Sequence, residues 1–139
     1  MDGFAFEDLS VGQTARFAKT ITEADILLFA AVSGDTNPVH IDAEHAAGTR
    51  FKQRIAHGKL SAALISTVLG TKLPGPGTIY MGQTLKFRAP VTIGQTVTAV
   101  VEVTALDPAK RRATLSTICL VGGKPVIEGE ATVMVPARG

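Results

Sequence analysis

The stretch that decides the fold is GKLSAALISTVLG, residues 58–70. Leu60, Leu64 and Val68 recur at helical spacing, and further apolar residues fall on the other faces of the same helix. No charged residue occurs from Leu60 to Thr71. A helix that is apolar nearly all round is normally buried. The segment therefore predicts a central helix that the rest of the chain must cover.

The chain after this helix is predicted to form strands. Residues 73–77, LPGPG, end the helix and form a tight linker. Beyond the linker, apolar and polar side chains alternate in segments typical of half-buried strands, at 79–88, 96–105, 113–121 and 126–135. The turn residues at 107–110 and the Gly122-Gly123 pair separate these strands.

The chain before this helix is predicted to contribute one strand and a second helix. Residues 14–20 fit a strand, and Thr22 with Asp25 forms the pattern of a capping box. Gly34 ends the helix that follows, and residues 43–48 fit a short helical turn. Runs of strands, rather than alternating βαβ units, predict an antiparallel α+β fold. With 139 residues, we expect one domain over residues 1–139.

Composition excludes several classes of function. The net charge of +2 is too small to indicate nucleic-acid binding, and no strand interleaves basic with aromatic residues. The longest apolar run, Ile26 to Val32, is too short to cross a membrane. Cys119 is the single cysteine, so we expect no internal disulfide and no multi-cysteine metal site. Neither a metal nor a cofactor is expected. Residues 1–4 lack the basic start of a signal peptide, and a cytoplasmic location is expected.

A polar segment, SGDTNPVHID at residues 33–42, carries the candidate chemistry. Asp35 and His40 lie five residues apart, and a carboxylate beside an imidazole can share proton transfer near neutral pH. Pro38 restricts its own backbone and that of Asn37, which predicts a shaped loop. The structural alternative is that Asp-x-Asn-Pro is ordinary turn chemistry with no catalytic role.

Residues 34–42, GDTNPVHID, resemble the signature of the R-specific, or type 2, enoyl-CoA hydratases, which are MaoC-like dehydratases. A second block, IAHG at residues 55–58, falls at the family's usual spacing. The resemblance extends roughly from Val11 to Val135. It implies the hot-dog fold, an antiparallel sheet wrapped around a long central helix, in agreement with the pattern of elements.

The resemblance also implies the reaction, a syn addition of water to a trans-2-enoyl-CoA that gives the (R)-3-hydroxyacyl-CoA. Asp35 would act as base on the water, and His40 would orient the water and help to deliver a proton to C2. The Gly58 N–H, at the start of the buried helix, would bind the oxyanion of the thioester. Either Ser61 or Ser66 could be a core hydroxyl bonded to the helix backbone, and by the same correspondence Ser66 is the one nearer the catalytic pocket.

Other polar residues are assigned lesser roles. The His57 ring is expected to support the turn before the helix, and His45 is expected at the surface. The basic loop at residues 49–54 is either solvated or a contact for coenzyme A phosphates. Lys59 departs from the family, which usually has an apolar residue there, so the pocket mouth and the substrate preference are expected to differ.

Other functions stay open on the sequence alone: a hot-dog acyl-CoA thioesterase, a 3-hydroxyacyl-ACP dehydratase and a non-catalytic acyl-binding module. The dehydratase shares the hydratase chemistry, and a module that only binds needs neither Asp35 nor His40. The open edges of a lone hot-dog sheet predict a homodimer, and neither a nucleic-acid nor a membrane partner is expected. Polyhydroxyalkanoate supply and fatty acid breakdown both use this reaction, and acyl chain length is not readable.

Overall fold

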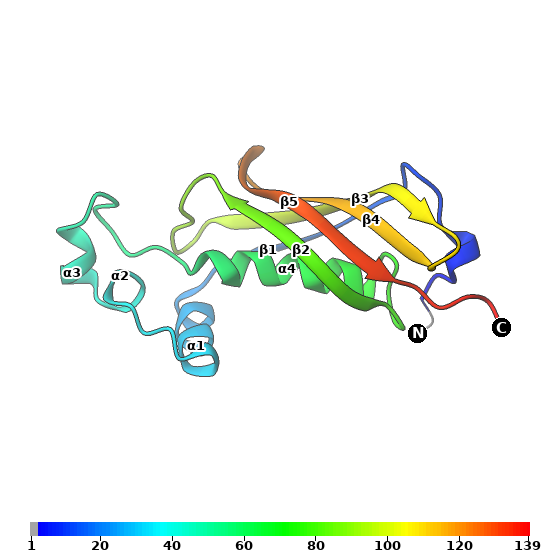
Figure 1. Ribbon diagram of the computed structural model, residues 1–139. Helices are drawn as coiled ribbons and strands as arrows, with labels where there is room; N and C mark the ends of the chain where they lie inside the picture. The colour runs from blue at the N-terminus through cyan, green and yellow to red at the C-terminus, as the bar shows by residue number, and fades with distance from the viewer. Residues whose placement is uncertain (1–2) are drawn as a thin grey trace.

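The computed structural model describes residues 3–139, within which five strands form one antiparallel sheet (Figure 1). The strands are β1 (Thr14–Thr20), β2 (Ile79–Phe87), β3 (Thr96–Asp107), β4 (Arg112–Val121) and β5 (Lys124–Met134). Their order across the sheet is β1-β3-β4-β5-β2, and each neighbouring pair runs antiparallel. The predicted antiparallel α+β fold is confirmed, with strand ends within two residues of those expected.

Helix α4 (Gly58–Thr71) lies along one face of the sheet and ends one residue later than predicted (Figure 1). Its buried residues are Ser61, Ala62, Leu64, Ile65, Val68 and Leu69. The expectation of burial nearly all round is wrong, however, because one stripe of the helix stays exposed. This exposed stripe consists of Lys59, Ala63, Ser66 and Gly70. The sheet covers only one side of α4, and no other part of the described chain covers this stripe.

The middle strands supply most of the core beneath α4. Along β3, Val97, Ala99, Val101 and Val103 are completely buried and alternate with more exposed residues. The inward side chains of β4 and β5 complete the same apolar cluster. This is the period-two pattern of strands with one covered face, and it fixes which side of the sheet α4 can occupy.

Three short helices form a separate layer at one end of the sheet (Figure 1). Helix α1 (Glu23–Ser33) begins with the predicted capping box and ends at Gly34, whose φ of 78° is left-handed. Helices α2 (Pro38–Ile41) and α3 (Ala43–Ala47) follow at once. The N-terminal lead-in contains only the short 3-10 helix η1 (Phe6–Asp8).

Strand β2 forms one edge of the sheet and differs from expectation in its burial. The sequence alternates apolar and polar residues, but Ile79 is 50% exposed, Met81 46% and Phe87 52%, and only Leu85 of the apolar set is half-buried. The alternation is therefore present while much of its apolar face is uncovered in the single chain. Among residues 3–139, no helix is long and apolar enough to cross a membrane.

Candidate active site

Asp35 is placed by the turn that follows α1. The Ser33 hydroxyl donates to the Phe29 carbonyl at 2.6 Å and accepts the Asp35 N–H at 3.1 Å. Asp35 Oδ1 in turn accepts the Asn37 N–H at 3.2 Å. These local bonds hold the carboxylate at the exposed end of α1 and fix the direction of the chain into α2.

His40 is placed by α2, where the sequence predicted only a shaped loop. Asn37 keeps a non-helical backbone, as expected before proline, and its side chain caps α2 by accepting the Val39 N–H at 3.1 Å. Pro38 then occupies the first helical position, where its fixed φ and missing N–H are tolerated. The prediction of a loop missed this favourable role of proline, and His40 stands on a single helical turn.

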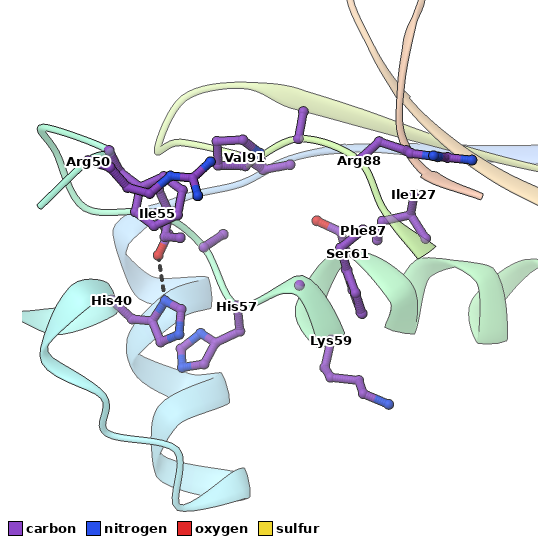
Figure 2. Close-up of a pocket in the computed structure, with 15 residues that line it drawn as sticks. His40, Arg50, Ile55, His57, Lys59, Ser61, Phe87, Arg88, Val91 and Ile127 are labelled. Carbon is purple, nitrogen blue, oxygen red and sulfur yellow. Dashed lines mark hydrogen bonds between the residues drawn. The ribbon is translucent and has the colours of Figure 1, made fainter. Parts of the chain in front are cut away.

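The orientation of the His40 ring follows from one hydrogen bond. His40 Nδ1 lies 2.8 Å from the Ile55 carbonyl oxygen, which can only accept, so Nδ1 carries the proton (Figure 2). This leaves Nε2 for proton exchange with a ligand. The ring is nearly buried, at 9% exposed.

Arg54 braces this arrangement, a role that the sequence did not reveal. Its Nε donates to the His40 carbonyl at 2.7 Å, and its two terminal nitrogens donate to the Glu23 carboxylate at 2.7 and 3.0 Å. The Arg54 side chain is only 14% exposed, so this member of the basic loop is not solvated. No signal in the sequence distinguishes Arg54 from Arg50 four residues earlier.

The two predicted catalytic residues come together, with His57 as a third. One carboxylate oxygen of Asp35 and one ring nitrogen each of His40 and His57 lie within 4.8 Å of one another. One bridging water can span this spacing. The His40 and His57 rings are stacked, with centroids 3.9 Å apart and planes 27° apart.

A cavity of about 460 Å³ extends from the two histidines of this cluster to the start of α4, and Asp35 is not among its lining residues. Its lining includes His40, His57 and Gly58 (Figure 2). The Gly58 N–H has no hydrogen-bond partner within residues 3–139, and it stands at the positive end of the helix. It is therefore free to donate to an oxyanion. The Phe87 ring lies against Gly58, so that a Cβ added there would be 2.5 Å from Cε1 of Phe87.

In the single chain, Ser61 lies beside the main cavity and Ser66 beside a different hollow. Ser61 lines the cavity with His57 and Gly58, and its buried hydroxyl has no partner in the described chain. Ser66, about two turns beyond Gly58, is exposed and lines a second hollow between α4 and β2. The single chain therefore does not bring Ser66 to His40. Lys59 lines both hollows, which places them side by side.

The cavity is positively charged at its polar positions. Arg50, Lys59 and Arg88 line it together with the two histidines, and no carboxylate does. Arg88 is paired with Glu128 at 2.9 Å, while Arg50 lies over the Phe51 ring at 5.2 Å. The other walls are apolar. Such a lining favours a ligand with an apolar part and an anionic part.

The single cysteine supplies no nucleophile to this site. Burial raises the pKa of the Cys119 thiol to about 12, so the reactive thiolate is absent near neutral pH. Its Sγ–H contacts the Ser61 carbonyl at 3.6 Å. Cys119 is thus the buried small residue that the strand pattern predicted.

Comparison with known proteins gives consistent matches over nearly the whole chain. Residues 8–129 match the family model described as MaoC like domain. An (R)-specific enoyl-CoA hydratase of Rhodospirillum rubrum is 64% identical over 134 residues, which are 96% of this chain and 93% of that protein.

Two solved structures are also similar. The unliganded R-hydratase PhaJ1 of Pseudomonas aeruginosa superposes with a TM-score of 0.92 at 50% identity, covering 98% of this chain and 88% of that one. The (R)-hydratase of A. caviae, described as involved in PHA biosynthesis, gives 0.91 at 49% identity, covering 94% and 99%.

Proposed function

This chain belongs to the MaoC-like domain family, and from that premise we propose that it is an (R)-specific enoyl-CoA hydratase, a hydro-lyase acting as one catalytic unit over its whole length. The observation that carries the proposal is that His40, with a free imidazole nitrogen, and Gly58, with an unpartnered helix-terminal amide, line one cavity, while the Asp35 carboxylate lies within 4.8 Å of a ring nitrogen of His40. Each of these groups answers one requirement of adding water to an enoyl thioester.

The proposed reaction uses one water held between Asp35 and His40. Asp35 takes a proton from the water as its oxygen attacks C3 of the enoyl group. Negative charge then develops on the thioester oxygen, and the Gly58 N–H donates to it from the positive end of α4. The free Nε2 of His40 orients the water, and the proton that Asp35 has taken passes through this nitrogen to C2, so the water supplies both the hydroxyl at C3 and the hydrogen at C2 and both side chains return to their starting states. Because both groups act from one face of the substrate, the addition is syn.

The carrier is proposed to be coenzyme A. Arg50, Lys59 and Arg88 line the cavity with no carboxylate among its lining residues, and cationic side chains stabilise phosphate groups. A comparison of crotonyl-CoA with crotonyl-acyl carrier protein tests this assignment. A kcat/KM higher for the protein carrier would instead favour the dehydratase of acyl carrier protein.

Ser66 is proposed to contact the acyl chain rather than the reacting atoms. Its hollow adjoins the main cavity at Lys59 and is lined by Ala62, Ala63 and residues 80–83. A chain extending from the thioester past Lys59 would reach it. Ser66→Ala should then change KM for long enoyl thioesters and leave turnover of crotonyl-CoA unaltered.

The chain is further proposed to act as a homodimer through the β2 edge. The exposed apolar face of β2 and the exposed stripe of α4 border the same hollow. The opposite edge, β1, carries Arg16 and Lys19 and offers less apolar surface. Pairing two β2 edges would extend the ladder and cover both features. We also propose a cytoplasmic location, which cell fractionation tests.

The deciding experiment is incubation of the purified protein with crotonyl-CoA. Loss of the enoyl thioester absorbance should accompany formation of 3-hydroxybutyryl-CoA, and chiral analysis should give the R product. Release of free thiol without hydration would show a thioesterase instead. An S product would contradict the proposed placement of Asp35 and His40.

A further inference from the structure

We propose that His57 is a positioning residue that holds Asp35, His40 and the Gly58 amide in one fixed arrangement. The kinetic part of this inference rests on the proposed hydratase function. The geometric part stands on the contacts of the His57 ring, which touches each of the other groups in a different way.

His57 occupies a position where its side chain does nothing for its own helix. It is the N-cap of α4, a place usually taken by Ser, Thr, Asp or Asn because their side chains accept a first-turn N–H. The His57 side chain makes no such bond. The ring is turned away and is only 2% exposed. The helix start thus forgoes a capping bond, and the ring is free for contacts elsewhere.

The first contact is to the backbone of Asp35. His57 Nε2 lies 2.9 Å from the Asp35 carbonyl oxygen, so Nε2–H is the donor. This bond ties the turn between α1 and α2 to the start of α4. Nδ1 is left as a buried acceptor without a partner in residues 3–139.

The second contact is to the ring of His40. The two imidazoles stack with their centroids 3.9 Å apart (Figure 2). The Phe29 ring of α1 also contacts His57, with centroids 4.8 Å apart and a tilt of 49°. His57 is therefore packed between α1 and α2, and its rotamer is fixed by both. The Ile55 bond sets the rotation of the His40 ring, and the stack on His57 holds the plane of that ring.

The third link is covalent, since Gly58 follows His57 directly in the chain. One ring thus connects the proposed base, the proposed proton donor and the oxyanion amide. Displacement of about 1 Å within such a set can cost roughly 10²-fold in rate. His57 is one lining residue of the cavity, and most of the walls that bind the ground state are formed by other residues, so removing the ring should lower kcat more than it changes KM.

Three substitutions separate the two contacts of the ring. His57→Phe keeps a ring for stacking and loses the donor, His57→Gln keeps a donor and loses the ring, and His57→Ala loses both. We expect His57→Ala to lower kcat by about 10²-fold with KM within roughly threefold, and each of the other two to lower kcat less. His45→Ala, an exposed histidine on α3, is the matched control and should leave kcat unchanged.

A double-mutant cycle distinguishes positioning from plain stabilisation. If His57 acts through His40, adding His57→Ala to His40→Ala should cause little further loss of kcat, because the group it positions is already gone. A further loss equal to that seen in the wild-type background would overturn the proposal. So would full kcat in both His57→Phe and His57→Gln, or a rise in KM alone.

Nitrogen-15 spectra of the imidazoles test the geometry without any turnover. The wild type should show His57 protonated at Nε2 and His40 protonated at Nδ1. His57→Phe should keep the single His40 tautomer, and His57→Ala should give a mixture. An unchanged His40 signal in His57→Ala would refute the stacking role. Failure of wild-type hydration, with these spectra as expected, would instead refute the proposed function alone.

Discussion

Asp35 and His40 reach the same point from different local structures, a turn bound to the end of α1 and a single turn of α2. Asp35 Oδ1 accepts one backbone N–H and no cation pairs with its carboxylate within the described chain. The His40 ring is held by the hydrogen bond of Nδ1 and by its stack on His57. At the scale of residues, each group is therefore fixed in position while one of its polar atoms stays available to a ligand.

Removal of either group should abolish most hydration while the fold persists. Positioned proton-transfer groups typically contribute about 10²–10⁴-fold, so Asp35→Asn and His40→Ala should each lower kcat on that order. The controls are Asp42→Asn, which keeps an N-cap for α3, and His45→Ala. Near-normal turnover in Asp35→Asn or His40→Ala would remove that residue from the site.

Gly58→Ala tests the oxyanion amide, and the structure adds a complication absent from the sequence. The new Cβ would crowd the Phe87 ring at 2.5 Å, but that ring is half exposed and can rotate away. We expect a small loss of stability and a large loss of kcat. Gly70→Ala, where a Cβ meets nothing within 4 Å, should stabilise the helix by up to about 1 kcal/mol and keep activity.

The double variant Gly58→Ala with Phe87→Ala separates the two causes of the loss. If the Cβ blocks the thioester, activity stays low after the clash is relieved. If activity returns, the loss came from displaced Phe87 and the amide was never obstructed.

At the scale of elements, α1 depends on an ion pair at its start. Asp25 Oδ2 accepts the N–H of Thr22, the N-cap of α1, and lies 2.6 Å from Lys19 Nζ on β1. The hydrogen bond from Lys19 lowers the pKa of the Asp25 carboxyl below its usual 3.8, against the opposing effect of burial. The charged carboxylate is thus favoured by the folded state, which joins α1 to the sheet.

This lowered pKa gives stability a defined pH dependence. A carboxyl whose pKa is depressed on folding stabilises the protein above its unfolded pKa, and the contribution is lost as pH falls through the folded value. The free-energy difference between wild type and Asp25→Asn should therefore shrink as pH falls from about 6 to about 3. Urea titrations at several pH values measure it, and a constant difference would contradict the assignment.

At the scale of the whole molecule, the proposed dimer can be broken at one edge. Met81→Lys places a charge on the exposed apolar face of β2, and charged side chains discourage edge pairing. Light scattering should shift toward the monomer mass. Val11→Lys is the matched control, because it places the same charge on an exposed apolar residue outside β2. It should leave the mass measured by light scattering unaltered.

Much of the molecule was predictable because its signals are local. The capping box at Thr22, the stop at Gly34 and the period-two burial of β3 depend on neighbouring residues, and all are confirmed. The motif also predicted that Asp35 and His40 converge. The hydratase assignment came from resemblance, and the comparisons support it.

What could not be predicted depends on contacts between distant segments. The bond of Arg54 to Glu23 joins residues 31 apart, and the stack of His57 on His40 needs three helices to be placed first. The burial of Ser61 and the exposure of Ser66 follow from which side of α4 the sheet covers, which helical periodicity leaves undecided. The exposed stripe of α4 has the same cause.

The separate layer formed by α1, α2 and α3 has a consequence for local unfolding. This layer is fastened mainly by the buried Ile21 and Ile26, by the Arg54–Glu23 pair and by the His40–Ile55 bond. Proteins open in cooperative units of unequal free energy, and a small peripheral unit opens before a packed sheet. Amides of α1 and α2 should therefore exchange with deuterium faster than those of β3 and β4. Activity should disappear in urea concentrations that leave the sheet folded, so the protein would fail as an enzyme before it fails as a fold.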